Sequence, residues 1–154
     1  MSEWTIKKAL EWTEGYLADK GDENPRLSAQ WLLSEACGLS RTQLFINFDR
    51  PLSEDERGVL RGYVRRRGAG EPLQYITGEV AFRHITVKVR PGVLIPRPDT
   101  EVLVQTVVHE LDSGADCRVL DLCAGSGCIG LAVASQVLRS RVLLGEWEDR
   151  KSVV

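Results

Sequence analysis

A glycine-rich turn follows a short apolar segment at residues 119–130, where the sequence reads Val-Leu-Asp-Leu-Cys-Ala-Gly-Ser-Gly-Cys-Ile-Gly. Its glycines, Gly125, Gly127 and Gly130, fit the pattern G-x-G-x-x-G, with a predicted strand before them and a predicted helix after them. Such a turn presents backbone N–H groups to a nucleotide-like cofactor at the carboxyl end of a strand. Glu146 lies at the end of the next predicted strand, where a carboxylate can accept hydrogen bonds from ribose hydroxyls. The pattern therefore predicts a cofactor site.

Asp121 indicates which cofactor the turn prefers. It comes shortly before Gly125, so we expect its carboxylate beside the turn. This charge would repel the pyrophosphate of a dinucleotide, but it would attract the ammonium and sulfonium groups of S-adenosylmethionine, whose own carboxylate suits the helix N-terminus. We expect S-adenosylmethionine rather than a nicotinamide cofactor. Two simpler interpretations stay open: Asp121 braces the turn by accepting backbone N–H bonds, and the glycines serve only helix–strand packing.

The first 70 residues are predicted to form a small helical bundle. The first helix should end near Gly21, and the second should begin at Asn24-Pro25 and stop at Gly38. Ser40 is placed to cap a short third helix, and Ser53 forms a predicted capping box with Glu56 at the start of a fourth. The fourth helix ends in a basic patch, Arg61, Arg65, Arg66 and Arg67, which either complements the helix dipole or contacts an acidic protein surface.

The apolar period changes after residue 70. Residues 80–89 alternate as in a β-hairpin, so residues 71–98 are predicted to be a hairpin linker. Asp99 or Thr100 should then cap a helix, with an apolar face formed by Leu103, Val104, Val107, Val108 and Leu111. A strand at 118–122, a helix at 129–137 and a strand at 141–144 complete one βαβ unit. The fold class is therefore α/β: a helical bundle, a hairpin and, over residues 99–154, the incomplete first part of a Rossmann-like domain.

Composition sets broad limits on the function. The chain has 154 residues, 43% of them hydrophobic and 27% charged, with a net charge of −2, which suits a packed protein without a general attraction for nucleic acid or anionic membranes. No apolar run approaches the roughly 18–20 residues of a membrane span, and the first residues lack the pattern of a signal peptide, so we expect a cytoplasmic protein. The spacing of Cys37, Cys117, Cys123 and Cys128 does not match common zinc sites, so we expect reduced cysteines and no metal.

Three segments together resemble a known family. The stretch from Asp121 to Gly127 is similar to motif I of the class I methyltransferases, whereas Pro72–Gly78, Phe82 and Leu94–Glu101 resemble the HemK/PrmC group. That group methylates the side-chain amide of the glutamine in the Gly-Gly-Gln motif of peptide chain release factors, using S-adenosylmethionine.

The resemblance also implies roles for parts of this chain. The cofactor loop would comprise Cys123, Ala124, Gly125, Ser126 and Gly127, beside Asp121, and Glu146 would hold the ribose. The helical domain would help to dock a release factor, and the protein is expected to be a monomer that contacts neither membrane nor nucleic acid.

The resemblance does not extend to catalysis. The family orients the poorly nucleophilic amide nitrogen with an Asn-Pro-Pro-Tyr segment, and the 154 residues contain no adjacent prolines. The sequence also departs from the family after Glu146. We therefore expect a C-terminally truncated, inactive chain without catalytic residues. Two alternatives are a methyltransferase acting on a nucleic-acid amine and a non-catalytic helical module that binds a release factor.

Overall fold

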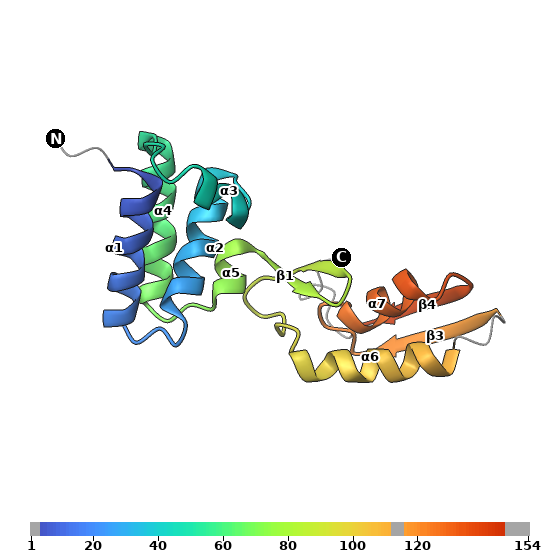
Figure 1. Ribbon diagram of the computed structural model, residues 1–154. Helices are drawn as coiled ribbons and strands as arrows, with labels where there is room; N and C mark the ends of the chain where they lie inside the picture. Colours follow the sequence, from blue (N-terminus) through green and yellow to red (C-terminus); the bar gives the residue numbers. More distant parts are fainter. Residues whose placement is uncertain (1–3, 112–115, 147–154) are drawn as a thin grey trace. The chain divides into compact units, whose positions relative to one another are not determined.

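The computed structural model describes residues 4–111 and 116–146, and the chain divides into two compact units, residues 1–77 and 78–154 (Figure 1). The first unit is helical and the second combines helices with strands, which confirms the predicted α/β class. The finer division into a docking domain at 1–70, a linker at 71–98 and a catalytic part from residue 99 stays a prediction. The predicted departure from the family after Glu146 lies outside the described residues.

Five helices build the first unit among its described residues: α1 (Ile6–Asp19), α2 (Pro25–Cys37), α3 (Arg41–Ile46), α4 (Glu54–Gly68) and α5 (Leu73–Thr77). Ser53 forms the predicted capping box with Glu56, and Ser40 caps α3 as predicted, in a capping box that was not predicted. Gly38 ends α2 in the left-handed conformation. Asn24 is the N-cap residue of α2, as predicted, but its side chain makes no capping hydrogen bond. The short helix α5 was not predicted.

A continuous apolar core holds the helical unit together. Its fully buried side chains come from three helices and include Ile6, Leu17, Leu32, Leu33 and Leu44. Leu60, Val64 and Ile76 add α4 and α5 to the same cluster. Because every member lies between residues 6 and 76, the unit has a hydrophobic core of its own.

An ion pair ties the turn after α1 to the end of α4. The Asp22 carboxylate accepts a hydrogen bond of 2.6 Å from Nε of Arg67, and its side chain is only 4% exposed. The same carboxylate accepts the Asn24 N–H at 2.9 Å, next to the start of α2. Burial alone would raise the pKa of Asp22, but the hydrogen bonds that it accepts outweigh burial and hold the pKa below its usual value.

The second unit contains an antiparallel hairpin and a parallel pair of strands. Strands β1 (Glu79–Phe82) and β2 (Ile85–Lys88) form the hairpin, with Val80 opposite Val87. Strand β3 (Cys117–Leu122) pairs in parallel with β4 (Ser140–Gly145). Helix α6 (Pro98–Leu111) precedes β3, and α7 (Cys128–Gln136) connects it to β4. This is the predicted βαβ connection.

The start and face of α6 differ from the prediction. The helix begins at Pro98, so Asp99 and Thr100 lie inside its first turn rather than at the cap. Proline suits this position because its φ is already helical and it needs no N–H partner. Val104 is fully buried as predicted. Leu103 is 51% exposed, because the residues of α6 that contact the core form a narrower stripe than the predicted apolar face.

Arg83 fastens the hairpin to both helices of the second unit. It lies in the hairpin turn with a φ of 50°, and its N–H donates to the Glu101 carboxylate at 3.2 Å. Its guanidinium donates to the Glu101 carbonyl at 3.1 Å and to the Gln136 side chain at 2.9 Å. One side chain therefore connects the hairpin with α6 and α7, around a core that contains Phe82, Val104 and Val133.

The two faces of the β3–β4 pair differ. Val119 and Val142 pack against the core of the unit, whereas Leu120, Leu122 and Leu143 are 56%, 69% and 67% exposed. Parallel strands are usually covered on both faces, so this outer face is unusually apolar for an exposed surface. Within residues 4–111 and 116–146, no helix has the length and apolar character required to cross a membrane.

We expect acid to destabilise the helical unit through Asp22. A carboxyl with a lowered folded-state pKa stabilises the fold above its unfolded pKa, near 4, and this stabilisation is lost as the pH falls through the folded value. At pH 7, Asp22→Asn should lower the free energy of unfolding by about 2 kcal/mol, because it leaves Arg67 without its charge partner. The variant should also weaken the pH dependence between pH 7 and pH 3, measured by urea unfolding followed by circular dichroism.

Asp49→Asn is the matched control, since Asp49 is exposed in the turn before α4 and the change in charge is the same. Equal losses of stability in the two variants would contradict the role given to the Asp22–Arg67 pair.

Candidate functional site

The glycine turn connects β3 to α7 with an alternating backbone. Cys123, Gly125 and Gly127 have φ values of 58°, 59° and 73°, all in the left-handed region, whereas Ala124 and Ser126 between them do not. The turn is closed by a hydrogen bond of 2.8 Å from the Gly127 N–H to the Ala124 carbonyl. The Ala124 N–H donates to the Gly145 carbonyl at 3.0 Å, so the turn is also bound to the end of β4.

The three glycines of the motif meet different surroundings. A Cβ at Gly125 would touch nothing closer than 4.0 Å, so this position is open and needs glycine only for its φ. At Gly127, where φ is also positive, a Cβ would lie 3.2 Å from a methyl carbon of Leu144. At Gly130 a Cβ would overlap the side chain of Leu144 and approach Val142 at 3.0 Å. Gly130 therefore lets α7 approach β4 closely, and Gly125 faces the open side of the turn.

Asp121 lies beneath the turn and contacts the helix. Its Oδ2 atom accepts the Gly130 N–H at 3.0 Å, so the carboxylate satisfies a backbone donor in the first turn of α7. The bracing interaction that the sequence left open is therefore present. The charge also reaches Cys128, since burial and then the Asp121 carboxylate both raise the pKa of that thiol.

Glu146 meets the turn from the end of β4. Its Oε2 atom accepts the Gly125 N–H at 2.7 Å, a short, charge-assisted hydrogen bond across 21 positions of sequence. The parallel register explains the meeting, because Leu122 at the end of β3 pairs with Gly145. Two carboxylates, those of Asp121 and Glu146, therefore bind backbone N–H groups at the two ends of the glycine motif.

The predicted loop residues differ in exposure. Cys123 is exposed, Ala124 and Gly125 are partly exposed, and Ser126 is 4% exposed. The structure thus brings together the Cys123–Gly127 loop, Asp121 and Glu146 at the carboxyl ends of β3 and β4. The hollow on the outer face of the strands, lined by residues such as Leu120 and Leu143, includes none of these residues.

All four cysteines are free thiols, and their surroundings differ. Burial and the nearby Glu56 carboxylate raise the pKa of Cys37 to about 11, so this thiol stays protonated at neutral pH. Within the residues that the structure describes, no cluster of three or more His, Cys, Asp or Glu side chains is arranged to hold a metal ion.

Sequence reasoning missed the contribution of Arg83 and Glu101 to this part of the unit. Glu101 belongs to the Leu94–Glu101 stretch, and its contacts with Arg83 give it a structural role. The contact joins residues 18 positions apart, so no local sequence pattern predicts it. The one sequence signal that pointed to Arg83 was its position in the hairpin turn, where the backbone has a positive φ.

Two alanine substitutions should separate packing from loop conformation. Gly130→Ala should lower the stability of the second unit by about 3 kcal/mol, because the added methyl overlaps Leu144 in a packed contact. Gly125→Ala should cost only about 1 kcal/mol, because it strains φ but meets open space. Hydrogen exchange of α7 amides, followed by mass spectrometry, measures both effects. Faster exchange in the Gly125 variant than in the Gly130 variant would contradict this assignment.

Comparison with known proteins shows which family this chain resembles. Residues 8–78 match the model of the PrmC N-terminal domain, a range that nearly coincides with the helical unit. The release factor glutamine methyltransferase of Geobacter sulfurreducens is 50% identical over 140 residues, covering 91% of this chain and 49% of the relative. Relatives with the same name from Rhodopirellula baltica and Moorella thermoacetica are 38% and 41% identical, each covering 90% of this chain and 48% or 49% of their own length.

The chain spans about half the length of the curated relatives that it matches. The matched domain and the identity over nine-tenths of the chain agree with the resemblance found in the sequence. The chain therefore belongs to the HemK/PrmC family, whose curated members are named release factor glutamine methyltransferases.

Proposed function

We propose that this chain provides the helical domain and the first part of the S-adenosylmethionine site of a peptide chain release factor N5-glutamine methyltransferase. The observation that carries the proposal is the pair of carboxylates at the glycine turn, with Glu146 on the Gly125 N–H and Asp121 on the Gly130 N–H. The names of the relatives supply the reaction and the protein substrate.

The charges at the turn support S-adenosylmethionine over a dinucleotide. A pyrophosphate group would need the outward N–H groups of the turn, and Gly125 already donates its N–H to a carboxylate. Bringing a diphosphate to this position would place negative charge beside Glu146 and Asp121, which is unfavourable at such short range. A ligand with an ammonium and a sulfonium group is instead attracted to the same two side chains.

Each residue of the proposed site has a defined task. Cys123–Gly127 would form the loop around the ligand, with the open position at Gly125 allowing close approach. Asp121 would face its positive charge, and Glu146 would accept hydrogen bonds from ribose hydroxyls. When bound, S-adenosylmethionine supplies an electrophilic methyl group. The chain's own residues bind and orient it.

The acceptor amide needs a second set of groups. An amide nitrogen is a weak nucleophile, and hydrogen-bond acceptors must orient its N–H groups for in-line attack. The family resemblance assigns this task to an Asn-Pro-Pro-Tyr segment, which the 154 residues do not contain. We therefore propose that the chain binds without transferring a methyl group.

A second candidate function is a non-catalytic module that captures a release factor. The observation in its favour is the independent core of the helical unit, whose members all lie between residues 6 and 76. Such a core allows the helical unit to fold and to bind without the cofactor site. This module would keep binding a release factor when the glycine turn is altered.

Binding of S-adenosylmethionine tests the proposed site. Asp121→Asn and Glu146→Gln keep an oxygen that can accept the same backbone N–H but remove the charge. Each should weaken the affinity for S-adenosylmethionine about tenfold in isothermal titration calorimetry, and NADH should bind to none of the proteins. Glu110→Gln, an exposed position on α6, is the matched control and should bind like the unaltered chain. Binding of NADH with S-adenosylmethionine excluded would overturn the proposal.

Methyl transfer provides a separate test. The chain is incubated with a purified release factor and S-adenosylmethionine that carries a tritiated methyl group, with the Geobacter sulfurreducens relative as the positive control. We expect label in the release factor only with the relative, because this chain lacks the groups that orient the amide. Label in the release factor above background with the 154-residue chain would refute the proposal that the Asn-Pro-Pro-Tyr segment alone supplies the groups that orient the amide.

A further inference from the structure

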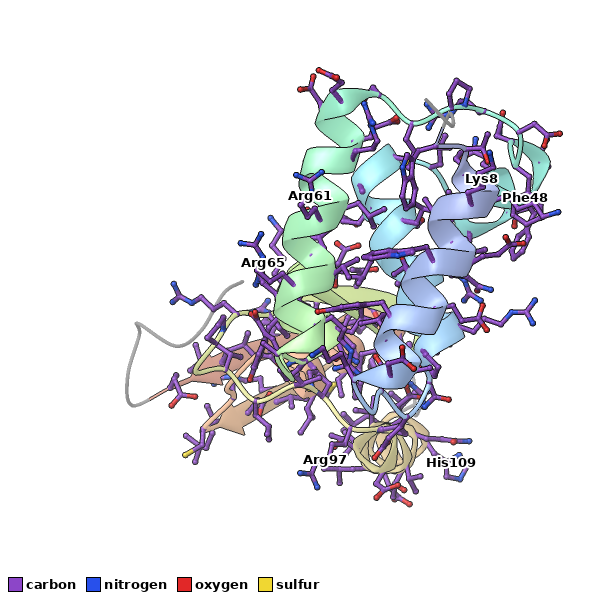
Figure 2. All side chains as sticks on the ribbon, turned by 90° about the vertical axis from the view of Figure 1, so that its left-hand side faces the viewer. Lys8, Phe48, Arg61, Arg65, Arg97 and His109 are labelled. Carbon is purple, nitrogen blue, oxygen red and sulfur yellow. The ribbon has the colours of Figure 1, made fainter. Side chains whose placement is uncertain are left out.

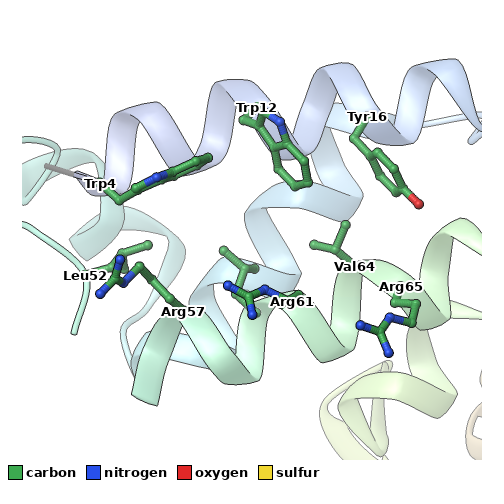
Figure 3. A pocket seen from close by; sticks show the side chains of 9 residues that line it. Trp4, Trp12, Tyr16, Leu52, Arg57, Arg61, Val64 and Arg65 are labelled. Carbon is green, nitrogen blue, oxygen red and sulfur yellow. The ribbon is translucent and has the colours of Figure 1, made fainter. Parts of the chain in front are cut away.

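An open groove of about 380 Å³ runs between α1 and α4 in the helical unit. One side is aromatic and is formed by Trp4, Trp12 and Tyr16, and the opposite side carries Arg57, Arg61 and Arg65 (Figure 3). Leu52, Leu60 and Val64 complete the lining. The two rows run in the same direction, with Trp4 near the Arg57 end and Tyr16 near the Arg65 end.

The aromatic side of the groove is ordered and accessible. Trp4 meets Trp12 edge-to-face with ring centroids 6.0 Å apart, and Trp12 stacks on Tyr16 at 5.4 Å. Tyr16 also lies under the Lys20 ammonium at 5.7 Å. Trp4 and Trp12 are still 39% and 52% exposed. Exposed tryptophans that are already held in place are typical anchors of protein interfaces, because little side-chain entropy is lost on binding.

The basic patch at the end of α4 separates into two pairs. Arg66 and Arg67 are engaged inside the unit, with Glu71 and Asp22 respectively. Among residues 4–111 and 116–146, the side chains of Arg61 and Arg65 make no hydrogen bond or ion pair, and both are exposed. Figure 2 shows that these two side chains project from the same side of α4. Internal ion pairs therefore account for Arg66 and Arg67 and leave Arg61 and Arg65 for another partner.

The spacing of these features indicates the shape of that partner. Arg61 and Arg65 lie one helical turn apart, about 6 Å. The lining from Arg57 to Arg65 extends about 12 Å along α4, which is roughly two turns of a helix. Carboxylates at positions i and i+4 of a partner's helix have the same spacing. The apolar face of that partner helix would fill the groove between the rings and Leu60.

We propose that the α1–α4 groove binds an acidic amphipathic helix of a partner protein, with its carboxylates on Arg61 and Arg65 and its apolar side chains against Trp4 and Trp12. The proposal uses the helical unit alone, so it does not rest on the cofactor site or on methyl transfer. A single-stranded nucleic acid is the less favoured occupant, because Trp12 and Tyr16 stack on each other and so offer fewer free ring faces to bases.

The test measures fluorescence anisotropy with the full 154-residue chain. The probe is a fluorescein-labelled helical peptide of sixteen residues, with leucine along one face and glutamate at positions one turn apart. A second peptide with lysine in place of glutamate, a third with serine in place of leucine, and a labelled oligouridine serve as comparison ligands. We expect binding of the first peptide, and binding at least tenfold weaker for each of the other three.

The variant pair assigns the binding to the groove. Arg61→Glu with Arg65→Glu should weaken binding of the acidic peptide about tenfold, and added salt should reduce the difference from the unaltered chain. Lys7→Glu with Arg26→Glu changes the net charge equally at exposed positions outside the groove lining, and it should have little effect. Circular dichroism checks that both variants remain helical.

Three outcomes would overturn the proposal. Equal weakening by the two double variants would show that only net charge matters. Undiminished binding by the peptide without leucine would show that the aromatic side takes no part. Tighter binding of oligouridine than of the acidic peptide, lost in the Arg61 and Arg65 variant, would identify the groove as a nucleic-acid site.

Discussion

The hydrogen bond between the Gly130 N–H and the Asp121 carboxylate determines how the second unit is assembled. It holds the first turn of α7 against the end of β3, at a distance where a Cβ at position 130 would overlap the side chain of Leu144 and lie 3.0 Å from Val142. The close approach lets α7 cover Val119 and Val142, while the Gly125 N–H in the turn before it donates to Glu146. The geometry of the candidate site is therefore a consequence of helix–strand packing.

The proposed ligand preference of the turn depends on the side chains that surround it. Glycine motifs that bind diphosphates leave their N–H groups to the ligand, since a helix N-terminus attracts negative charge. Here a protein carboxylate, that of Glu146, already accepts one of these groups. The electrostatic field at the turn is thereby less favourable for anions and more favourable for cations. The glycine pattern of the turn is the same as in the diphosphate-binding motifs. Ligand preference at such a turn depends on the neighbouring side chains more than on the glycines.

Local signals were predictable from the sequence, and long-range contacts were not. Ser53 and Glu56 predict their capping box within three residues, and Ser40 predicts the start of α3. The strand–turn–helix order around Gly125 follows from apolar periodicity. Helix α5 was missed because a helix of five residues between Pro72 and Gly78 is too short to show a period. The Asp22–Arg67 pair joins residues 45 positions apart, and the Arg83–Gln136 contact 53, so only the folded chain reveals them. The carboxylate of Glu146 was expected near the turn, but its bond to Gly125 required the register of β3 and β4.

The stack of Trp12 on Tyr16 has an optical consequence. Aromatic transitions on rings this close couple to each other, and the edge-to-face contact of Trp4 adds a third chromophore in a fixed orientation. The near-ultraviolet circular dichroism of the helical unit should therefore contain a coupled signal that depends on the relative angles of these rings. This signal would come from the surface that Trp4, Trp12 and Tyr16 form, and it would respond to small rotations of these rings. The unaltered chain could therefore be followed at this surface without attaching a dye.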